Sequence, residues 1–143
     1  MTGISPKWAV LARLIGLWLP VAAYMAAIFY MSSQSEPIPG LRLAHGTDKL
    51  AHAMAYSLLG YLMARATIGT WPNRRPVSMA FLGALAASLY GVSDEIHQSF
   101  VPGRVPCVGD VLADAFGAFL GAYVLLFLHG RRRKLIQRLE GRG

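Results

Sequence analysis

The 143-residue chain has a single cysteine, few charged residues and few acidic ones. A lone thiol, Cys107, excludes an intrachain disulfide framework and zinc sites built from cysteine pairs. Charged residues make up 15% of the sequence, whereas soluble domains average about 25%. Hydrophobic residues reach 55%, and a chain this short cannot bury that much apolar surface in water. The composition therefore predicts an integral membrane protein with one domain, residues 1–143.

Four apolar stretches approach the length of about 20 residues that a membrane-spanning helix needs. We expect transmembrane helices at about residues 8–31, 48–68, 77–95 and 110–129. The sequence lacks the ten-residue alternating segments that a closed β-barrel would require. We therefore predict an all-α, four-helix membrane bundle, with a kink at Pro20. A cleaved signal peptide is the competing interpretation of the first stretch, but its apolar region would be shorter.

The basic residues indicate how the bundle is oriented. Fourteen Lys and Arg outnumber seven Asp and Glu, which gives a formal net charge of +7. With four spans, the two termini lie on the same side of the membrane. Most of the Lys and Arg residues fall on that side: Lys7, Arg13, Arg65, Arg74, Arg75, Arg131, Arg132, Arg133, Lys134, Arg138 and Arg142. The positive-inside rule places both termini in the cytoplasm, with residues 130–143 as a basic cytoplasmic tail. The positive charge thus points to membrane lipids as partners, and not to nucleic acid.

The acidic residues segregate in the opposite sense. Apart from Glu140, they fall on or toward the outer side: Glu36, Asp48, Asp94, Glu95, Asp110 and Asp114. Carboxylates contribute little to topology, so this placement needs another cause. A polar site that faces the outside of the membrane would supply one. The apolar pair Phe100-Val101 favours a re-entrant loop between the third and fourth helices, next to that site.

The second predicted helix carries a polar stripe. Asp48, His52 and Tyr56 are spaced by four residues, so they share one face, which must turn toward the interior of the bundle. Each residue alone has an ordinary structural explanation: the first helical turn for Asp48, an interhelical hydrogen bond for His52 and packing for Tyr56. The coincidence of all three on one face favours a site.

The third helix and the loop after it point toward the same space. Gly83, Ala87 and Gly91 are spaced by four residues, and Glu95 continues the same line. Another helix can approach this face of small residues closely, so we expect the Glu95 carboxylate to point inward. Gln98 follows, and Pro102-Gly103 favours a tight turn that brings Arg104 back over the carboxylates. An ordinary solvated loop with a charge pair is the alternative.

The fourth helix repeats the arrangement. Asp110 and Asp114 precede a GxxxG packing motif formed by Gly117 and Gly121. Asp110 has an alternative role as a helix cap, but Asp114 lies a full turn inside an apolar run. Its carboxylate therefore needs a cation or a hydrogen-bond donor as partner. The candidates for that partner are Arg104, Lys49 and His52.

These residue types suit acid–base chemistry and the binding of a polar ligand. A carboxylate beside a histidine can act as general base and acid, and Lys or Arg can hold an anion such as phosphate. We interpret His52, Glu95 and Asp48 as the candidate general acid–base residues. The candidate ligand-binding residues are Gln34, Lys49, Tyr56, Gln98, Arg104, Asp110 and Asp114. Their spacing matches no compact metal motif such as HExxH, so we predict no metal and no other cofactor, with a divalent metal as the weaker alternative.

The motifs and their order resemble the VanZ-like family over about residues 29–121. The residues that carry the resemblance are Ser33-Gln34, Asp48-Lys49, His52, Tyr56, Asp94-Glu95, Gln98, Pro102-Gly103-Arg104 and Asp110. The resemblance implies a small bacterial inner-membrane protein, in a family whose namesake is linked to low-level resistance to the glycopeptide teicoplanin. It also implies functional roles for Asp48, Lys49, His52, Tyr56, Glu95, Gln98, Arg104 and Asp110. Two positions depart from the pattern: Asp114, where many relatives are expected to have Asn, and Cys107, to which we assign no catalytic role.

Three functional hypotheses follow. In the first, the polar site faces the cell envelope and binds a glycan-linked or lipid-linked ligand, and the residues fit binding and chemical modification equally. In the second, the chain is a non-catalytic structural or partner module whose polar groups lock the helices together, and these groups should then be fully paired. In the third, it is a transporter or channel, which requires a polar path from Tyr56 toward Arg65. The sequence contains no signal for an oligomeric state.

Overall fold

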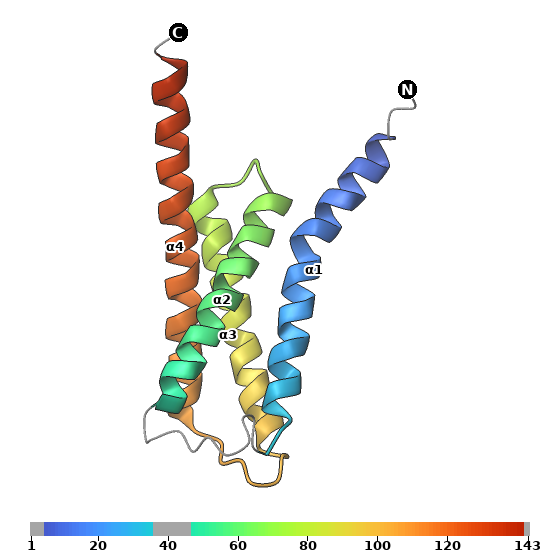
Figure 1. Cartoon of the computed structure of the whole chain (residues 1–143), viewed down its shortest axis with the longest axis vertical. Helices are drawn as coiled ribbons and strands as arrows, with labels where there is room; N and C mark the ends of the chain where they lie inside the picture. The colour runs from blue at the N-terminus through green and yellow to red at the C-terminus, as the bar shows by residue number, and fades with distance from the viewer. Residues whose placement is uncertain (1–4, 36–46, 142–143) are drawn as a thin grey trace.

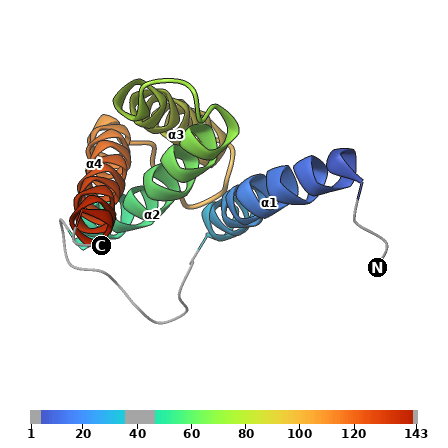
Figure 2. The same cartoon turned by 90° about the horizontal axis from the view of Figure 1, so that it is seen from above.

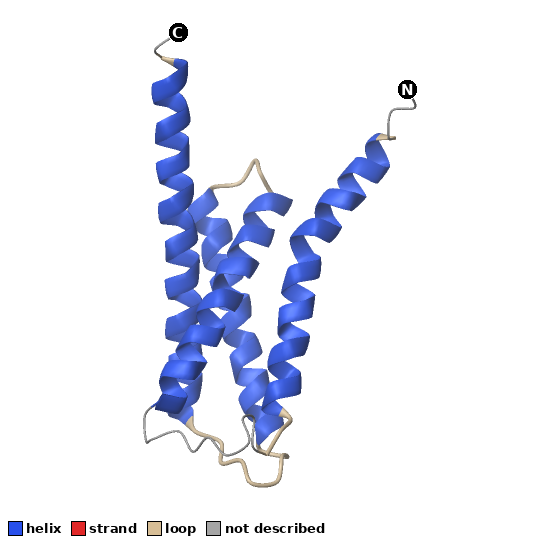
Figure 3. Ribbon diagram, viewed as in Figure 1, coloured by secondary structure: helices blue, strands red, loops and turns tan. Residues whose placement is uncertain are grey.

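The computed structural model describes residues 5–35 and 47–141, and within them it contains helices, turns and loops but no strand (Figure 3). The helices are α1 (Pro6–Ser32), α2 (Thr47–Thr70), α3 (Pro76–Gln98) and α4 (Val108–Glu140). Successive helices run in opposite directions, so the start of α1 and the end of α4 lie at the same end of the bundle (Figure 1). The prediction of an all-α bundle is confirmed.

The basic segment at the carboxyl end is helical. α4 continues to Glu140, whereas we expected a helix ending near residue 129 and then a tail. Leu, Arg, Lys, Gln and Glu dominate this segment, and they are good helix formers that extend a helix past the single Gly130. Residues 131–141 are exposed, and this part of α4 projects beyond the other helices (Figure 1). Residues 142–143 of the predicted tail, and Glu36 of the predicted acidic side, lie outside the described residues.

Three of the four helices, α1, α3 and α4, are long and apolar enough to cross a membrane. α2 is less apolar because it lies between the other helices (Figure 2) and packs against all three of them. Its outward stripe is still apolar, with Leu50, Met54 and Leu58 exposed. The chain therefore has the helices of a membrane protein, and the helix without such a long apolar stretch lies at the centre.

The packing of α2 against α4 depends on glycine. A Cβ added to Gly117 would overlap the carbonyl oxygen of Ala53, and one added to Gly121 would overlap that of Ser57. Gly60 of α2 lies just as close to the backbone of α4. Small residues of this kind let two helix backbones touch. The GxxxG motif thus serves as the packing surface that the sequence predicted.

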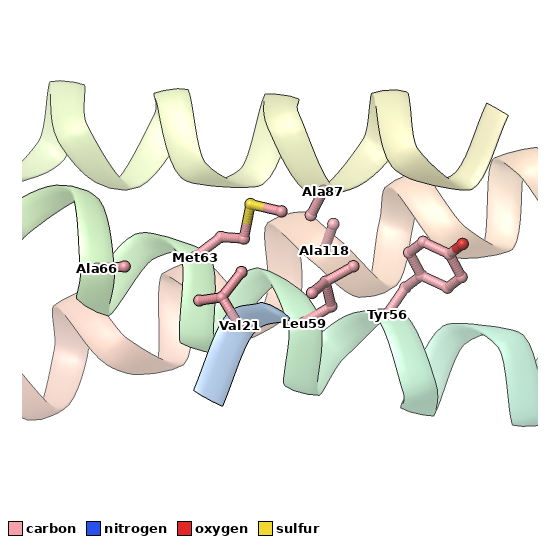
Figure 4. Close-up of a cluster of buried hydrophobic side chains, with 7 residues drawn as sticks. All are labelled: Val21, Tyr56, Leu59, Met63, Ala66, Ala87 and Ala118. Atoms are coloured by element: carbon pink, nitrogen blue, oxygen red, sulfur yellow. The ribbon is translucent and has the colours of Figure 1, made fainter. Parts of the chain in front are cut away.

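An apolar core fills the middle of the bundle (Figure 4). Its buried members come from all four helices: Val21, Tyr56, Leu59, Met63, Ala66, Ala87 and Ala118. A second small cluster of alanines joins α2, α3 and α4 nearer the end where α4 projects. The core is built largely from small side chains, because the glycine contacts leave little space between the backbones.

α1 is held to α2 by hydrogen bonds that satisfy helix carbonyl groups. Pro20 has no N–H, so the carbonyl of Gly16 loses its partner within the helix. Arg65 of α2 donates to this carbonyl oxygen from Nη2 at 3.2 Å. In return, Arg13 donates to the carbonyl of Gly69 at 2.6 Å. α1 bends away from the other helices in its N-terminal half (Figure 1), consistent with a kink at Pro20.

We expect Gly117→Ala to destabilise the protein by at least about 2 kcal/mol, because its methyl group would overlap the α2 backbone. Gly130→Ala is the matched control, since a Cβ at Gly130 meets nothing within 4 Å. We expect the control to raise the free energy of unfolding by less than about 1 kcal/mol, because alanine has a higher helix propensity than glycine. Thermal unfolding of both purified variants in detergent measures the difference. Equal stabilities would contradict the glycine-dependent packing.

Candidate functional site

Polar side chains gather at one end of the bundle, where α2 begins, α3 ends and α4 begins, opposite the start of α1 (Figure 1). We call this group the polar cluster. It consists of Lys49, His52 and Tyr56 on α2, Asp94, Glu95 and Gln98 on α3, Arg104 and Cys107 in the connecting loop, and Asp110 and Asp114 on α4. Most of the members on helices are buried, so the cluster is part of the protein interior and not a solvated surface.

Two ion pairs connect α2 to α4. Lys49 Nζ donates to Asp110 Oδ1 at 2.8 Å. One turn deeper, His52 Nδ1 is hydrogen-bonded to Asp114 Oδ1 at 3.0 Å. His52 is therefore the partner that the sequence required for Asp114. This bond uses Nδ1, which leaves Nε2 as the histidine nitrogen available to a bound molecule.

The end of α3 contributes a further pair and anchors the loop. Gln98 Nε2 donates to Asp94 Oδ2 at 3.0 Å. Glu95 Oε1 accepts a short hydrogen bond from the backbone N–H of Cys107. Asp94 was not among our predicted site residues, although its place on the buried stripe of α3, three residues after Gly91, would have identified it. The role of the Cys107 backbone depends on the path of the loop, for which the sequence has no signal.

Several buried polar atoms of the cluster have no hydrogen-bond partner among the described residues. They are Tyr56 Oη, Asp94 Oδ1, Glu95 Oε2, Arg104 Nε and Asp114 Oδ2. Tyr56 and Asp114 are 1% exposed, Asp94 is 4% exposed and Glu95 is 7% exposed. Each unpartnered group of this kind costs about 1–3 kcal/mol of stability. The cluster is therefore not a set of fully paired groups.

Gly91 lets these groups meet. A Cβ added there would lie 2.9 Å from Asp114 Cβ and 3.1 Å from Tyr56 Cε1. The side chains of Tyr56 and Asp114 thus pack directly on the backbone of α3. Tyr56 also lies within electrostatic reach of Asp94 and Glu95. The stripe of small residues on α3 has the role that the sequence predicted, which is to bring acidic groups into a shared interior.

The loop forms the predicted turn. Gly103 has φ = +84°, and the backbone N–H of Arg104 donates to the carbonyl of Val101 at 3.1 Å. These are the features of a type II turn with Pro102 and Gly103 in the centre. Arg104 is partly buried but forms no ion pair within the described part of the chain. Its guanidinium is therefore not neutralised by the carboxylates over which we expected it to lie.

Two other predicted residues have local contacts. Asp48 lies in the first turn of α2, where its Oδ1 accepts the backbone N–H of Lys49 at 2.9 Å. This is the first-turn contact that the sequence offered for Asp48, and its Oδ2 also lies 3.9 Å from Nζ of Lys49 in the polar cluster. Gln34 lies two residues past the end of α1, and its Nε2 donates to the carbonyl of Tyr30 at 3.3 Å. Within the described residues, its side chain forms no hydrogen bond with the polar cluster.

His97 is a contact residue that the sequence analysis missed. Its Nε2 is hydrogen-bonded to Ser33 Oγ at 3.0 Å. Its ring stacks on Phe29, with the centroids 4.4 Å apart. These contacts join the end of α1 to the end of α3 beside the polar cluster. No spacing pattern in the sequence predicts these contacts, because the partners are far apart along the chain.

The opposite side of Tyr56 is apolar. Leu59, Met63 and Ala66 follow Tyr56 along α2 within the hydrophobic core (Figure 4). The transport hypothesis required polar groups along this path toward Arg65, and the core occupies that position instead. The described residues also contain no group of three or more His, Cys, Asp or Glu arranged to hold a metal ion.

Comparison with known proteins identifies the family. The family model described as VanZ/LLP1 matches residues 17–129. No curated protein and no solved structure matches the chain. The match includes most of the length of every helix and the whole polar cluster. The resemblance seen in the motifs is thereby confirmed, and the chain belongs to the VanZ/LLP1 family.

Proposed function

We propose that the chain binds a glycan-linked or lipid-linked ligand of the bacterial cell envelope in the polar cluster. In this proposal the protein lies in the inner membrane, both termini are cytoplasmic, and the cluster faces outward. The bias of basic residues toward the end of the bundle that carries the termini supports this orientation. The family assignment supports a bacterial membrane protein.

The observation that carries the proposal is the incomplete pairing of the cluster. Evolution removes buried polar groups that lack a partner unless they serve a purpose, because their cost is a large part of the net stability. Four acidic or phenolic side chains and Arg104 each keep such an atom. A bound molecule that supplies hydrogen bonds to them would recover the lost energy. Incomplete pairing of this kind is typical of binding and catalytic sites.

The pair formed by His52 and Asp114 equips the site for proton transfer. A carboxylate on Nδ1 fixes the orientation and tautomer of the imidazole, so that Nε2 can take or give a proton. Glu95 is held by the loop amide through one oxygen and keeps the other unpartnered, which gives it the second acid–base role. Arg104 would contact an acceptor group of the ligand. This arrangement supports modification of the ligand as well as binding.

A non-catalytic structural or partner module is the second candidate. It is favoured by the bridges from Lys49 to Asp110 and from His52 to Asp114, which join α2 to α4 as a lock would. In that case, loss of the polar groups should lower the amount of folded protein. The two functions therefore predict different effects of the same substitutions.

Arg104→Ala should abolish the effect of the protein on the envelope while leaving its membrane-inserted amount nearly unchanged, because Arg104 loses no ion pair with any described residue. The effect is measured by mass spectrometry of envelope lipids and muropeptides, with and without the protein, and by teicoplanin susceptibility. Arg132→Ala, on the exposed end of α4, is the matched control and should behave as wild type. A parallel loss of inserted protein in Arg104→Ala would favour the structural candidate.

Asp94→Asn should raise the stability of the unliganded protein by about 1 kcal/mol or more, since an amide is easier to bury than a partly paired carboxylate. Glu140→Gln removes an exposed carboxylate at the far end of α4 and should change stability by less than about 0.5 kcal/mol. Thermal or denaturant unfolding in detergent measures both. A clear destabilisation by Asp94→Asn would show that this carboxylate locks the bundle.

A further inference from the structure

We infer that the polar cluster recognises a primary ammonium group on its ligand, and not a phosphate or another anion. The inference rests on the proposed function, because it names the chemistry of the ligand for the same site. It differs from the expectation that Lys or Arg holds an anion there.

Three of the five unpartnered buried atoms of the cluster are carboxylate oxygens, whereas Arg104 Nε is a donor and the Tyr56 hydroxyl can donate or accept. Asp94 Oδ1, Glu95 Oε2 and Asp114 Oδ2 are carboxylate oxygens, and each belongs to a side chain that is more than nine-tenths buried. A carboxylate can only accept hydrogen bonds when it is ionised. An anionic ligand would add negative charge and leave the same oxygens unpartnered. A ligand that satisfies them must bring donors.

The cationic side chains nearby are already committed. Lys49 donates to Asp110, and His52 is bonded to Asp114. Within the described residues, Arg104 is the one permanent cation of the cluster that makes no ion pair, and it lies in the loop at the edge of the cluster. Carboxylates thus exceed cations in the interior. The local charge favours a positive ligand group.

Tyr56 provides a second observation that is independent of the acidic residues. Its side chain is 1% exposed, and its hydroxyl oxygen has no hydrogen-bond partner within residues 5–35 and 47–141. The hydroxyl is directed away from the hydrophobic core and toward α3 (Figure 4), where Asp94 lies. The ring of Tyr90 is 6.5 Å from that of Tyr56, centroid to centroid. Aromatic rings beside carboxylates form the environment in which proteins commonly bind organic ammonium groups.

The described residues do not favour a metal ion as the positive group. The acidic groups lie within electrostatic reach of Tyr56 and of one another, but no three of the described His, Cys, Asp and Glu side chains converge closely enough to coordinate a metal. A primary ammonium carries three N–H donors and can pair with one or two carboxylate oxygens at about 2.8 Å, so it does not need three converging protein ligands.

The ammonium group has two chemical sources in an envelope, an amino sugar or the headgroup of an aminolipid, and the experiment separates them. Full-length protein is purified into nanodiscs, and its thermal unfolding is measured with matched pairs of probes. The soluble pair is glucosamine and N-acetylglucosamine. The lipid pair is nanodiscs with phosphatidylethanolamine and nanodiscs with phosphatidylglycerol.

We expect the ammonium member of at least one pair to raise the unfolding temperature relative to its partner. Asp94→Asn and Glu95→Gln should weaken that response by about tenfold or more in apparent affinity, the loss that follows removal of a hydrogen bond to a charged group. Glu140→Gln should retain the wild-type response. Because both variants in the cluster replace buried carboxylates with neutral amides of the same shape, loss of folding is not expected to obscure the comparison.

No difference between the members of either pair would overturn the ammonium inference. So would stabilisation by phosphatidylglycerol that is lost in Arg104→Ala, which would indicate recognition of an anion. In both cases the proposed function is judged separately, by the envelope composition of cells that carry Arg104→Ala. If that composition equals the one seen with the wild-type protein, the proposed function fails as well.

Discussion

The close approach of α2 and α4 is the contact on which the rest of the structure depends. Gly60, Gly117 and Gly121 allow the two backbones to touch, and this contact determines which side chains meet at the end of the seam. His52 faces Asp114 there, and Lys49 faces Asp110. The buried core residues Leu59 and Met63 follow Tyr56 along α2, so apolar packing closes one side of the polar cluster. The glycine contacts thus position both the ion pairs and the apolar core beside them.

The polar cluster combines groups that stabilise the fold with groups that do not. The pairs between α2 and α4 and the bond from Cys107 to Glu95 hold the helix ends and the loop in place. In the part of the chain that the structure describes, the second oxygens of Asp94, Glu95 and Asp114 have no hydrogen-bond partners. Such groups lower stability, and their presence is understandable if a ligand supplies the missing donors. The fixed pairs then act as the frame that holds the ligand-binding atoms in position.

The sequence predicted the elements of this arrangement better than its contacts. Period-four stripes identified the inward faces of α2, α3 and α4, because helix geometry converts spacing directly into direction. The partner of Asp114 remained one of three candidates, since the pairing depends on the relative heights of two helices. Cys107 and His97 were missed for a similar reason: their contacts depend on the path of a loop and on the packing of α1. Gln34 matched a motif, yet among the described residues its side chain is hydrogen-bonded to the carbonyl of Tyr30 and not to the cluster.

The central claim is that the polar cluster forms a site that faces outward, and the single cysteine of the chain allows a direct test. Cys107 is partly exposed, and its Sγ lies 3.6 Å from Lys49 Nζ within the cluster. A membrane-impermeant maleimide applied to intact spheroplasts should label Cys107. It should label Arg132→Cys in a Cys107→Ser background only after the membrane is permeabilised. The reverse pattern would place the cluster in the cytoplasm and contradict the account.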